Sequence, residues 1–297
     1  MAACSGSTQQ AAQPVAAPAT GIVLLSLQDG SQKGSATIGT DTVAVTVSDD
    51  GRVAYLADSS PGDVYAADLP SLDVKWKSHV GDAPFGLLMF GGHLLVSLFN
   101  TNAVVELDPS SGKQLARHTV PLGPAVMTLD AMGTPLVAGT RGNVARLDGS
   151  TVPAGHGFGV AVVGAVTWTA DYERAELVRA GDGHIVGMPQ PLFPFWLAPG
   201  KDGTLLIAAE GGTEDTDPGG VFSFNPASGV FTTLAEPRDP DQVLQSGDSV
   251  LVAAHGDHDV LDITAGRTSV WASGTSPVAI AADPKLGMLV EAVNARE

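Results

Sequence analysis

"GHLLVSLFNTNAVVELDPSSGK", residues 92–113, contains two short apolar runs, separated by a polar turn and closed by a turn with Asp-Pro and Gly-Lys. The runs are rich in Val and Leu, while Asn, Pro, Ser and Gly occupy the turns. Short runs of this kind between such turn residues predict a pair of β-strands. Helical periodicity is weak here and throughout the chain, so the stretch favours an all-β fold.

The same order of turn, strand, polar turn, strand and closing turn recurs along the chain. The further copies are "GRVAYLADSSPGDVYAADLPS" from Gly51, "GTPLVAGTRGNVARLDGS" from Gly133, "GTLLIAAEGGTEDTDPGGVFSFNPASG" from Gly203 and "DSVLVAAHGDHDVLDITAG" from Asp248. A strand marked by Pro or Gly precedes most copies, as in "GDAPFGLLMF" and "PLFPFWLAPG". Spacing of about 40 residues indicates repeated four-stranded units.

We mark off seven such units, which begin near residues 38, 79, 120, 153, 189, 235 and 274. A four-stranded sheet of this size cannot bury both faces alone, and radial stacking against neighbours solves the problem. The last unit has two strands, "SPVAIAAD" and "GMLVEAV", and the N-terminal "GIVLLSLQDGSQKGSATIG" supplies two more. We therefore predict a seven-bladed β-propeller of four-stranded antiparallel blades over residues 21–297, whose last blade is closed by the N-terminal strands.

These repeats resemble the YVTN-type, lactonase-like (quinoprotein-like) propeller superfamily. The resemblance rests on the "G-x-x-P-x-x-hydrophobic" strand, the "DG-x-hydrophobic-hydrophobic" strand and "VVELDPSSGK" at residues 104–113. It covers residues 21–297 and implies the propeller fold, although such motifs say little about function. The paired Gly-His and Trp-Asp signature of WD40 repeats does not recur in this sequence.

The N-terminus "MAACSGS" resembles the cleavage and lipidation site of bacterial lipoproteins. Cys4, the single cysteine, would then carry the lipid after removal of a signal peptide, and residues 1–20 would form a flexible tether. The alternative is a chance cysteine in a disordered leader. We expect an extracytoplasmic protein of the cell envelope that contacts the membrane only through this lipid anchor.

The charge of the chain limits its partners. It has 15 Lys and Arg against 32 Asp and Glu, a formal net charge of −17. Nucleic acids and anionic membrane surfaces require basic patches, so neither is expected as a partner. We expect a monomer that binds an envelope protein, a polymer or a small ligand.

In a propeller, the end of each second strand and the start of each first strand lie at one mouth of the central channel. The predicted second-strand ends are Asp58, Phe99, Thr140, Asp171, Glu210, His255 and Asn294. The predicted first-strand starts are Asp41, Pro84, Pro124, His156, Phe195 with Trp196, Asp241 with Gln242, and Pro277. We therefore predict a polar and mostly acidic channel mouth.

Carboxylates and His side chains at one mouth are suitable ligands for Ca²⁺ or Zn²⁺. We predict Glu210, His255 and His258 as candidate metal ligands, with His255 and Glu210 sharing a site with His156 or Asp241. The alternative is that these side chains are solvated turn ends.

Two further features near the mouth remain open. The insertion "EGGTEDTDPGG" at residues 210–220 places Asp215 and Asp217 in a partial calcium-loop pattern, or it covers the channel or binds a partner. Trp196 either stacks on a ligand or fills space between blades.

Three functions fit these observations. The first, which we favour, is a non-catalytic binding or scaffold protein of the cell envelope. The second is the metal-dependent lactonase-like hydrolase that the resemblance suggests, although Phe99 and Thr140 interrupt the acidic ring. Its ligands or base would be Glu210, His255, Asp171, Asn294 and Asp58. The third is a zinc carrier that uses His156, His255 and His258. The sequence contains neither H-E-x-x-H nor G-x-S-x-G, so an enzyme is the less favoured class.

Overall fold

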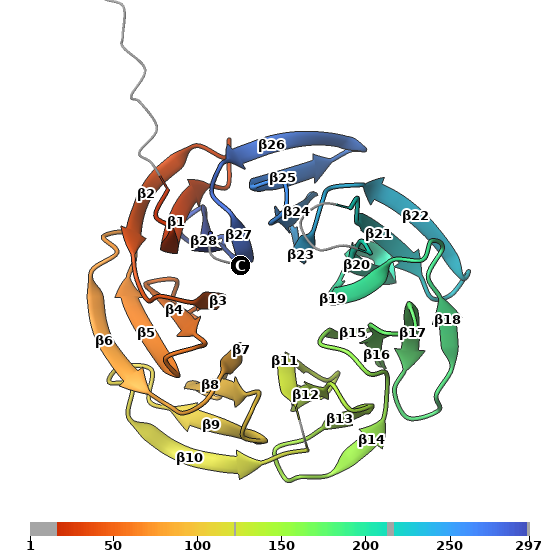
Figure 1. Ribbon diagram of the computed structural model, residues 1–297, viewed down its shortest axis with the longest axis horizontal. Coiled ribbons are helices and arrows are strands. Elements are labelled where there is room, and N and C mark those ends of the chain that lie inside the picture. Colours follow the sequence, from red (N-terminus) through yellow and green to blue (C-terminus); the bar gives the residue numbers. More distant parts are fainter. Residues whose placement is uncertain (1–16, 122, 213–216, 296–297) are drawn as a thin grey trace, which may run out of the picture.

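The computed structural model describes residues 17–121, 123–212 and 217–295. It confirms the predicted all-β architecture, with seven four-stranded antiparallel sheets arranged around a central axis (Figure 1). In each blade below, the strands run from the innermost to the outermost.

Blade 1 consists of β3 (Thr42–Val47), β4 (Val53–Asp58), β5 (Asp63–Asp68) and β6 (Val74–His79). Blade 2 consists of β7 (Pro84–Phe90), β8 (His93–Leu98), β9 (Ala103–Leu107) and β10 (Gln114–Thr119). Blade 3 consists of β11 (Pro124–Leu129), β12 (Pro135–Gly139), β13 (Asn143–Ala145) and β14 (Thr151–Pro153). Blade 4 consists of β15 (Val160–Val163), β16 (Val166–Asp171), β17 (Glu176–Arg179) and β18 (Ile185–Gly187).

Blade 5 consists of β19 (Phe193–Pro199), β20 (Leu205–Glu210), β21 (Gly220–Asn225) and β22 (Val230–Ala235). A short 3₁₀ turn, η1 (Lys201–Gly203), connects β19 to β20. Blade 6 consists of β23 (Pro240–Ser246), β24 (Ser249–Ala254), β25 (Asp259–Thr264) and β26 (Arg267–Ser273). Blade 7 consists of β27 (Pro277–Asp283), β28 (Met288–Asn294), β1 (Thr20–Ser26) and β2 (Gln32–Thr37).

Blade 7 closes the ring with both ends of the chain, as predicted. Strand β1 pairs with β28 along its whole length, from Thr20 opposite Asn294 to Ser26 opposite Met288. This pairing leaves no open edge between the first and last segments of the propeller. Among the described residues, no helix is long and apolar enough to cross a membrane.

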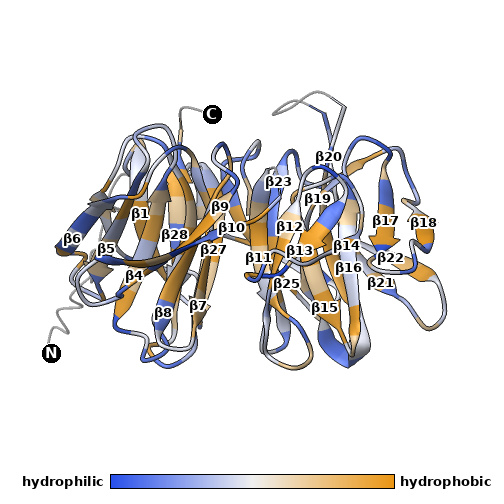
Figure 2. Ribbon diagram, turned by 90° about the horizontal axis from the view of Figure 1, so that it is seen from below, coloured by the Kyte–Doolittle hydropathy of each residue, from blue (hydrophilic) through white to orange (hydrophobic). Residues whose placement is uncertain are grey.

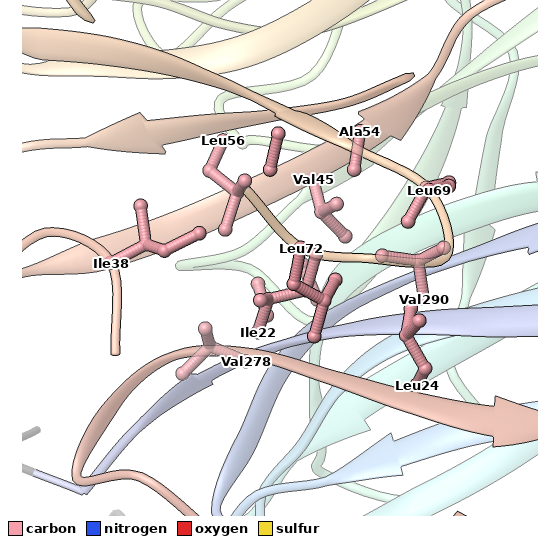
Figure 3. Close-up of a cluster of buried hydrophobic side chains, with 13 residues drawn as sticks. Ile22, Leu24, Ile38, Val45, Ala54, Leu56, Leu69, Leu72, Val278 and Val290 are labelled. Atoms are coloured by element: carbon pink, nitrogen blue, oxygen red, sulfur yellow. The ribbon is translucent and has the colours of Figure 1, made fainter. Parts of the chain in front are cut away.

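Hydrophobic residues fill the spaces between neighbouring blades rather than one central core. Figure 2 shows them along strands such as β7, β8 and β28. Between blades 7 and 1, Ile22, Leu24 and Val290 pack towards Val45 and Leu56 (Figure 3). Each sheet therefore buries both of its faces against neighbours, which explains why a repeat of short apolar strands is stable only as a ring.

The innermost strands share a local irregularity that positions the site. In six blades the pairing of the first two strands shifts near the start of the first strand, as between Pro194 and Trp196 and between Pro240 and Gln242. A β-bulge leaves the extra residue without a cross-strand partner and can redirect its side chain. Phe195 and Asp241 occupy these bulges in blades 5 and 6.

Candidate ligand site at the channel mouth

One hydrogen bond recurs at the channel mouth and identifies equivalent residues. The carbonyl of the residue that leads into the first strand accepts a hydrogen bond from the backbone N–H of the residue at, or just after, the end of the second strand. The donor–acceptor pairs are Ser59–Asp41, Phe99–Ala83, Thr140–Gly123, Tyr172–His156, His255–Asp239 and Asn294–Ser276, at 2.8–3.1 Å. In blade 5, Glu210 lies opposite Phe193, which precedes Pro194 as Asp239 precedes Pro240. The mouth position is therefore Ser59, Phe99, Thr140, Tyr172, Glu210, His255 and Asn294.

Asp58 and Asp171 lie one residue before this mouth position. Because successive residues of a strand point to opposite faces, a shift of one residue changes their surroundings. Asp58 is 1% exposed and accepts hydrogen bonds from the backbone N–H groups of Thr40 and Asp41. Asp171 is equally buried and accepts the backbone N–H of His156 at 3.2 Å. Both carboxylates thus support the loop that leads into the first strand of their blades.

Asp41 and Asn294 are bonded to each other where blades 1 and 7 meet. The Asn294 amide Nδ2 donates to Asp41 Oδ1 at 3.0 Å, and the Ser60 backbone N–H donates to Asp41 Oδ2 at 2.9 Å. Asn294 is fully buried. This pair joins the closing blade to the first one at the rim of the channel.

The acidic part of the mouth lies between blades 5 and 6. One carboxylate oxygen each from Glu210, Asp239 and Asp241 lies within 4.8 Å of the others, so the group could hold a metal ion. Glu210 and Asp239 are 7% and 9% exposed. His255 is also buried, and its Nδ1 lies 3.8 Å from Asp241 Oδ2. The structure thus brings Glu210, Asp241 and His255 together and adds Asp239.

Crowded carboxylates with little exposure repel one another unless a proton or a cation intervenes. The atoms that this group offers to a metal ion are carboxylate oxygens, the type of ligand that Ca²⁺ prefers. Asp239 also has a backbone φ of 42°, an uncommon conformation for a residue with a side chain. The equivalent residues Ala83, Gly123 and Ser276 also have positive φ values, so this conformation belongs to the repeated lead into the first strand.

An aromatic wall continues from the acidic group across blades 5, 4 and 2. The Tyr172 hydroxyl donates to Glu210 Oε2 at 2.5 Å and so joins the two parts. The ring of Phe158 lies 5.0–6.3 Å from the rings of Phe85, Phe99, Phe195 and Tyr172. Phe193 lies 5.3 Å from Tyr172. One side of the mouth is therefore acidic and the other side is aromatic.

The structure places other predicted residues outside this acidic group. His156 is exposed, and its ring lies against Gly142 of blade 3. His258 is exposed, and its Nδ1 lies 2.8 Å from Ser276 Oγ, so it links blade 6 to blade 7. Asp217 is exposed, whereas Asp215, like Cys4, lies outside the described residues.

Trp196 lies in the channel wall. With Phe85, Gln242 and residues of the other inner strands, it lines a central cavity of about 170 Å³. Its side chain also packs against the apolar side chains between blades, so Trp196 both borders the channel and fills space between blades.

Sequence reasoning missed Asp239, Tyr172 and Phe158. A signal for Asp239 was present, because it precedes the strand-opening Pro240 just as Ser276 precedes Pro277. Tyr172 was missed because the sequence predicted Asp171, one residue earlier, as the mouth residue of blade 4. Phe158 lies in the loop before β15, where no strand pattern indicates the direction of a side chain.

Fold and site together define a seven-bladed β-propeller with an acidic and aromatic channel mouth. No protein-family model and no curated protein sequence matches this chain. Several solved structures resemble its fold. Hydrazine synthase of Kuenenia stuttgartiensis has a TM-score of 0.68 at 14% identity, over 88% of this chain and 95% of that chain.

Two further solved structures are also similar. The periplasmic gluconolactonase PpgL of Pseudomonas aeruginosa has a TM-score of 0.62 at 14% identity, over 93% of this chain and 97% of that chain. BamB from Moraxella catarrhalis has a TM-score of 0.57 at 18% identity, over 95% of this chain and 94% of that chain. Identities this low establish a shared fold and leave function to the site itself.

Proposed function

We propose that this protein is a lipid-anchored, extracytoplasmic binding protein that holds its ligand at the channel mouth with the help of a divalent cation. The observation that carries the proposal is the convergence of Glu210, Asp239 and Asp241 within 4.8 Å beside an aromatic wall. The lipoprotein-like "MAACSGS" supports the anchor and the location.

The chemistry of the two sides suggests the class of ligand. A cation on the carboxylates would accept further oxygen ligands, since Ca²⁺ binds six to eight oxygens. The rings around Phe158 offer apolar faces on which a flat group can stack. A sugar or sugar acid combines hydroxyl or carboxylate oxygens with an apolar ring face, so it matches both sides.

Thermal unfolding with and without Ca²⁺ tests the cation. A ligand that binds only the folded state stabilises it by about 2.7 kcal/mol at a concentration of 100 times its Kd. We expect Ca²⁺ to raise the Tm of the wild type and to lose most of this effect in Glu210→Gln and Asp239→Asn.

Glu236→Gln is the matched control, because it removes one negative charge from an exposed residue near Asp239. It should keep the full response to Ca²⁺. Absence of any response in the wild type, or an equal loss in the control, would contradict the cation site. A response to Zn²⁺ and not to Ca²⁺ would favour the carrier function instead.

A hydrolase is the second candidate, because His255 lies beside the carboxylates and the fold resembles a periplasmic gluconolactonase. A cation could polarise a lactone carbonyl, and a carboxylate or His255 could take a proton from the attacking water. Hydrolysis of gluconolactone in the presence of Ca²⁺ separates the two functions. Turnover that His255→Asn abolishes while Ca²⁺ binding persists would favour the enzyme, whereas binding without turnover favours the binding protein.

A further inference from the structure

A second concave site lies between blades 4 and 5, at the end of the propeller opposite the mouth. The cavity has a volume of about 380 Å³, and we call it the side pocket. Its apolar lining includes Val163, Val166, Trp168, Val186 and Phe224. Glycines of the turns between β15 and β16, β19 and β20, and β21 and β22 also line it, and these turns are at the far end of each strand from the mouth.

The corresponding place between blades 1 and 2 is closed. There the Tyr55 hydroxyl and the Trp76 indole Nε1 both donate to the carbonyl oxygen of Pro109, at 3.2 and 3.0 Å. The two rings lie 5.8 Å apart. A Cβ on Gly112 would lie 2.6 Å from the Trp76 ring, so the indole covers the turn of blade 2 directly.

The two places are equivalent by register. Tyr55 lies three residues before Asp58 and Trp168 three residues before Asp171, and both of these Asp residues support the lead loop of their blade. Tyr55 of β4 pairs with Ala66 of β5, and Ala66 pairs with Trp76 of β6, so Trp76 lies two pairings outward from Tyr55.

His184 holds the position of Trp76 in blade 4. Trp168 pairs with Arg179, whose N–H donates to the His184 carbonyl, so His184 is likewise two pairings outward from Trp168. The turns Asp108–Gly112 and Asn225–Gly229 also match, each with a backbone hydrogen bond of 2.8 Å between its ends. Pro226 therefore corresponds to Pro109.

The hydrogen bonds of the closed interface are missing from the side pocket. Trp168 is 2% exposed, and its Nε1 has no hydrogen-bond partner within residues 17–121, 123–212 and 217–295. A Cβ on Gly229 would meet nothing within 4 Å. Burying an indole N–H without an acceptor is unfavourable, since such a group loses its hydrogen bond to water. The indole of Trp168 thus makes no hydrogen bond to the turn of Pro226, and no ring covers Gly229 as Trp76 covers Gly112.

We propose that the side pocket binds a small, neutral, apolar ring compound, and that a shift of the covered Trp168 indole on binding lets its Nε1 donate a hydrogen bond to the carbonyl group of this compound. Its volume lies in the range of small-molecule sites. The charged residue at its rim, Arg179, is already bonded to Asp182 at 3.0 and 2.6 Å, so a neutral carbonyl fits better than a carboxylate. The proposal does not depend on the function of the mouth.

Indole N–H resonances of ¹⁵N-tryptophan-labelled protein test this site. The probes are 1-indanone and indane, which share a ring system and differ in the carbonyl oxygen. We expect 1-indanone to shift the Trp168 resonance downfield, with Trp168→Phe assigning that resonance. One hydrogen bond of about 1 kcal/mol should make 1-indanone bind about fivefold more tightly than indane.

Two variants close the pocket. His184→Trp introduces the residue that closes the interface of blades 1 and 2, and Val166→Phe fills the same space from β16. Both should abolish the shift, whereas His79→Trp on the outer strand of blade 1 should preserve it. The proposal is overturned if neither probe shifts the Trp168 resonance, if the two probes bind equally, or if the shift survives in the filled variants.

Discussion

The interface of blades 1 and 2 and that of blades 4 and 5 use one backbone plan with opposite results. In the first, Tyr55 and Trp76 donate to the carbonyl of Pro109, and the Trp76 ring covers the turn at Gly112. In the second, Trp168 and His184 stand at the same positions, and a cavity of about 380 Å³ remains. The two interfaces differ at both positions, Tyr55 against Trp168 and Trp76 against His184, and in the described part of the chain only the second leaves a cavity of this size beside its turn.

The interface of blades 6 and 7 extends this comparison to an ionisable group. Three residues before the mouth position, six blades have Leu56, Val96, Val137, Thr169, Ile207 and Val252, but blade 7 has Glu291. Glu291 is fully buried, and the residues opposite it on the two neighbouring strands are Val23 and Ile280, both of them apolar and buried. Burial raises the pKa of its carboxyl to about 8, and the Thr275 hydroxyl only partly offsets this. Unlike the indole of Trp168, this group can respond to pH.

We expect Glu291 to have the largest effect. Its folded pKa lies above its ordinary value of 4.5, so the folded state retains a proton that the unfolded state releases. Its contribution to stability is complete below pH 4.5 and is lost as the pH rises through 8. The loss is on the order of 5 kcal/mol.

Urea unfolding of wild type and Glu291→Gln at pH 5, 7 and 9 measures this loss. Relative to the wild type, Glu291→Gln should gain stability from pH 5 to pH 9, because glutamine stays neutral. Glu236→Gln, at an exposed position, should follow the wild type. Parallel curves for Glu291→Gln and wild type would show that Glu291 does not retain its proton.

A pair of glycines provides the next test. Gly112 and Gly229 have φ values of 70° and 71°, so alanine strains both turns by about 1 kcal/mol. In blade 2 the added methyl also meets the Trp76 ring, which must then move away from Pro109. This displacement should lower the free energy of unfolding by about 2 kcal/mol more. Urea unfolding should therefore show losses of about 3 kcal/mol for Gly112→Ala and about 1 kcal/mol for Gly229→Ala. Equal losses would mean that Trp76 does not pack tightly on its turn.

Much of the fold could be predicted because its signals are local and repeated. Apolar runs, polar turns and Pro-led strands define each blade, and the two strands after residue 274 require two from the N-terminus. The site was less accessible because it depends on single-residue register. Nothing in "LAD" at residues 56–58 shows that Asp58 lies one residue before the mouth position. Nor does "RDPDQ" at residues 238–242 reveal the bulge at Asp241.

The smallest expected effect comes from Tyr55→Phe, which removes one of the two donors to Pro109. Burial raises the pKa of Tyr55 to about 12, so its hydroxyl stays protonated and keeps donating at neutral and alkaline pH. Because Trp76 still donates to the same carbonyl, no acceptor is left unsatisfied, and we expect urea unfolding to show a loss of about 1 kcal/mol in the free energy of unfolding.

A double-mutant cycle tests the equivalent positions of blades 4 and 5. In the His184→Trp background, the further change Trp168→Phe should lower the free energy of unfolding more than Trp168→Phe does alone, if the two tryptophans of the closed variant share an acceptor. Urea unfolding of the four proteins in this cycle measures the difference, and a coupling energy of zero would show that Pro226 cannot replace Pro109.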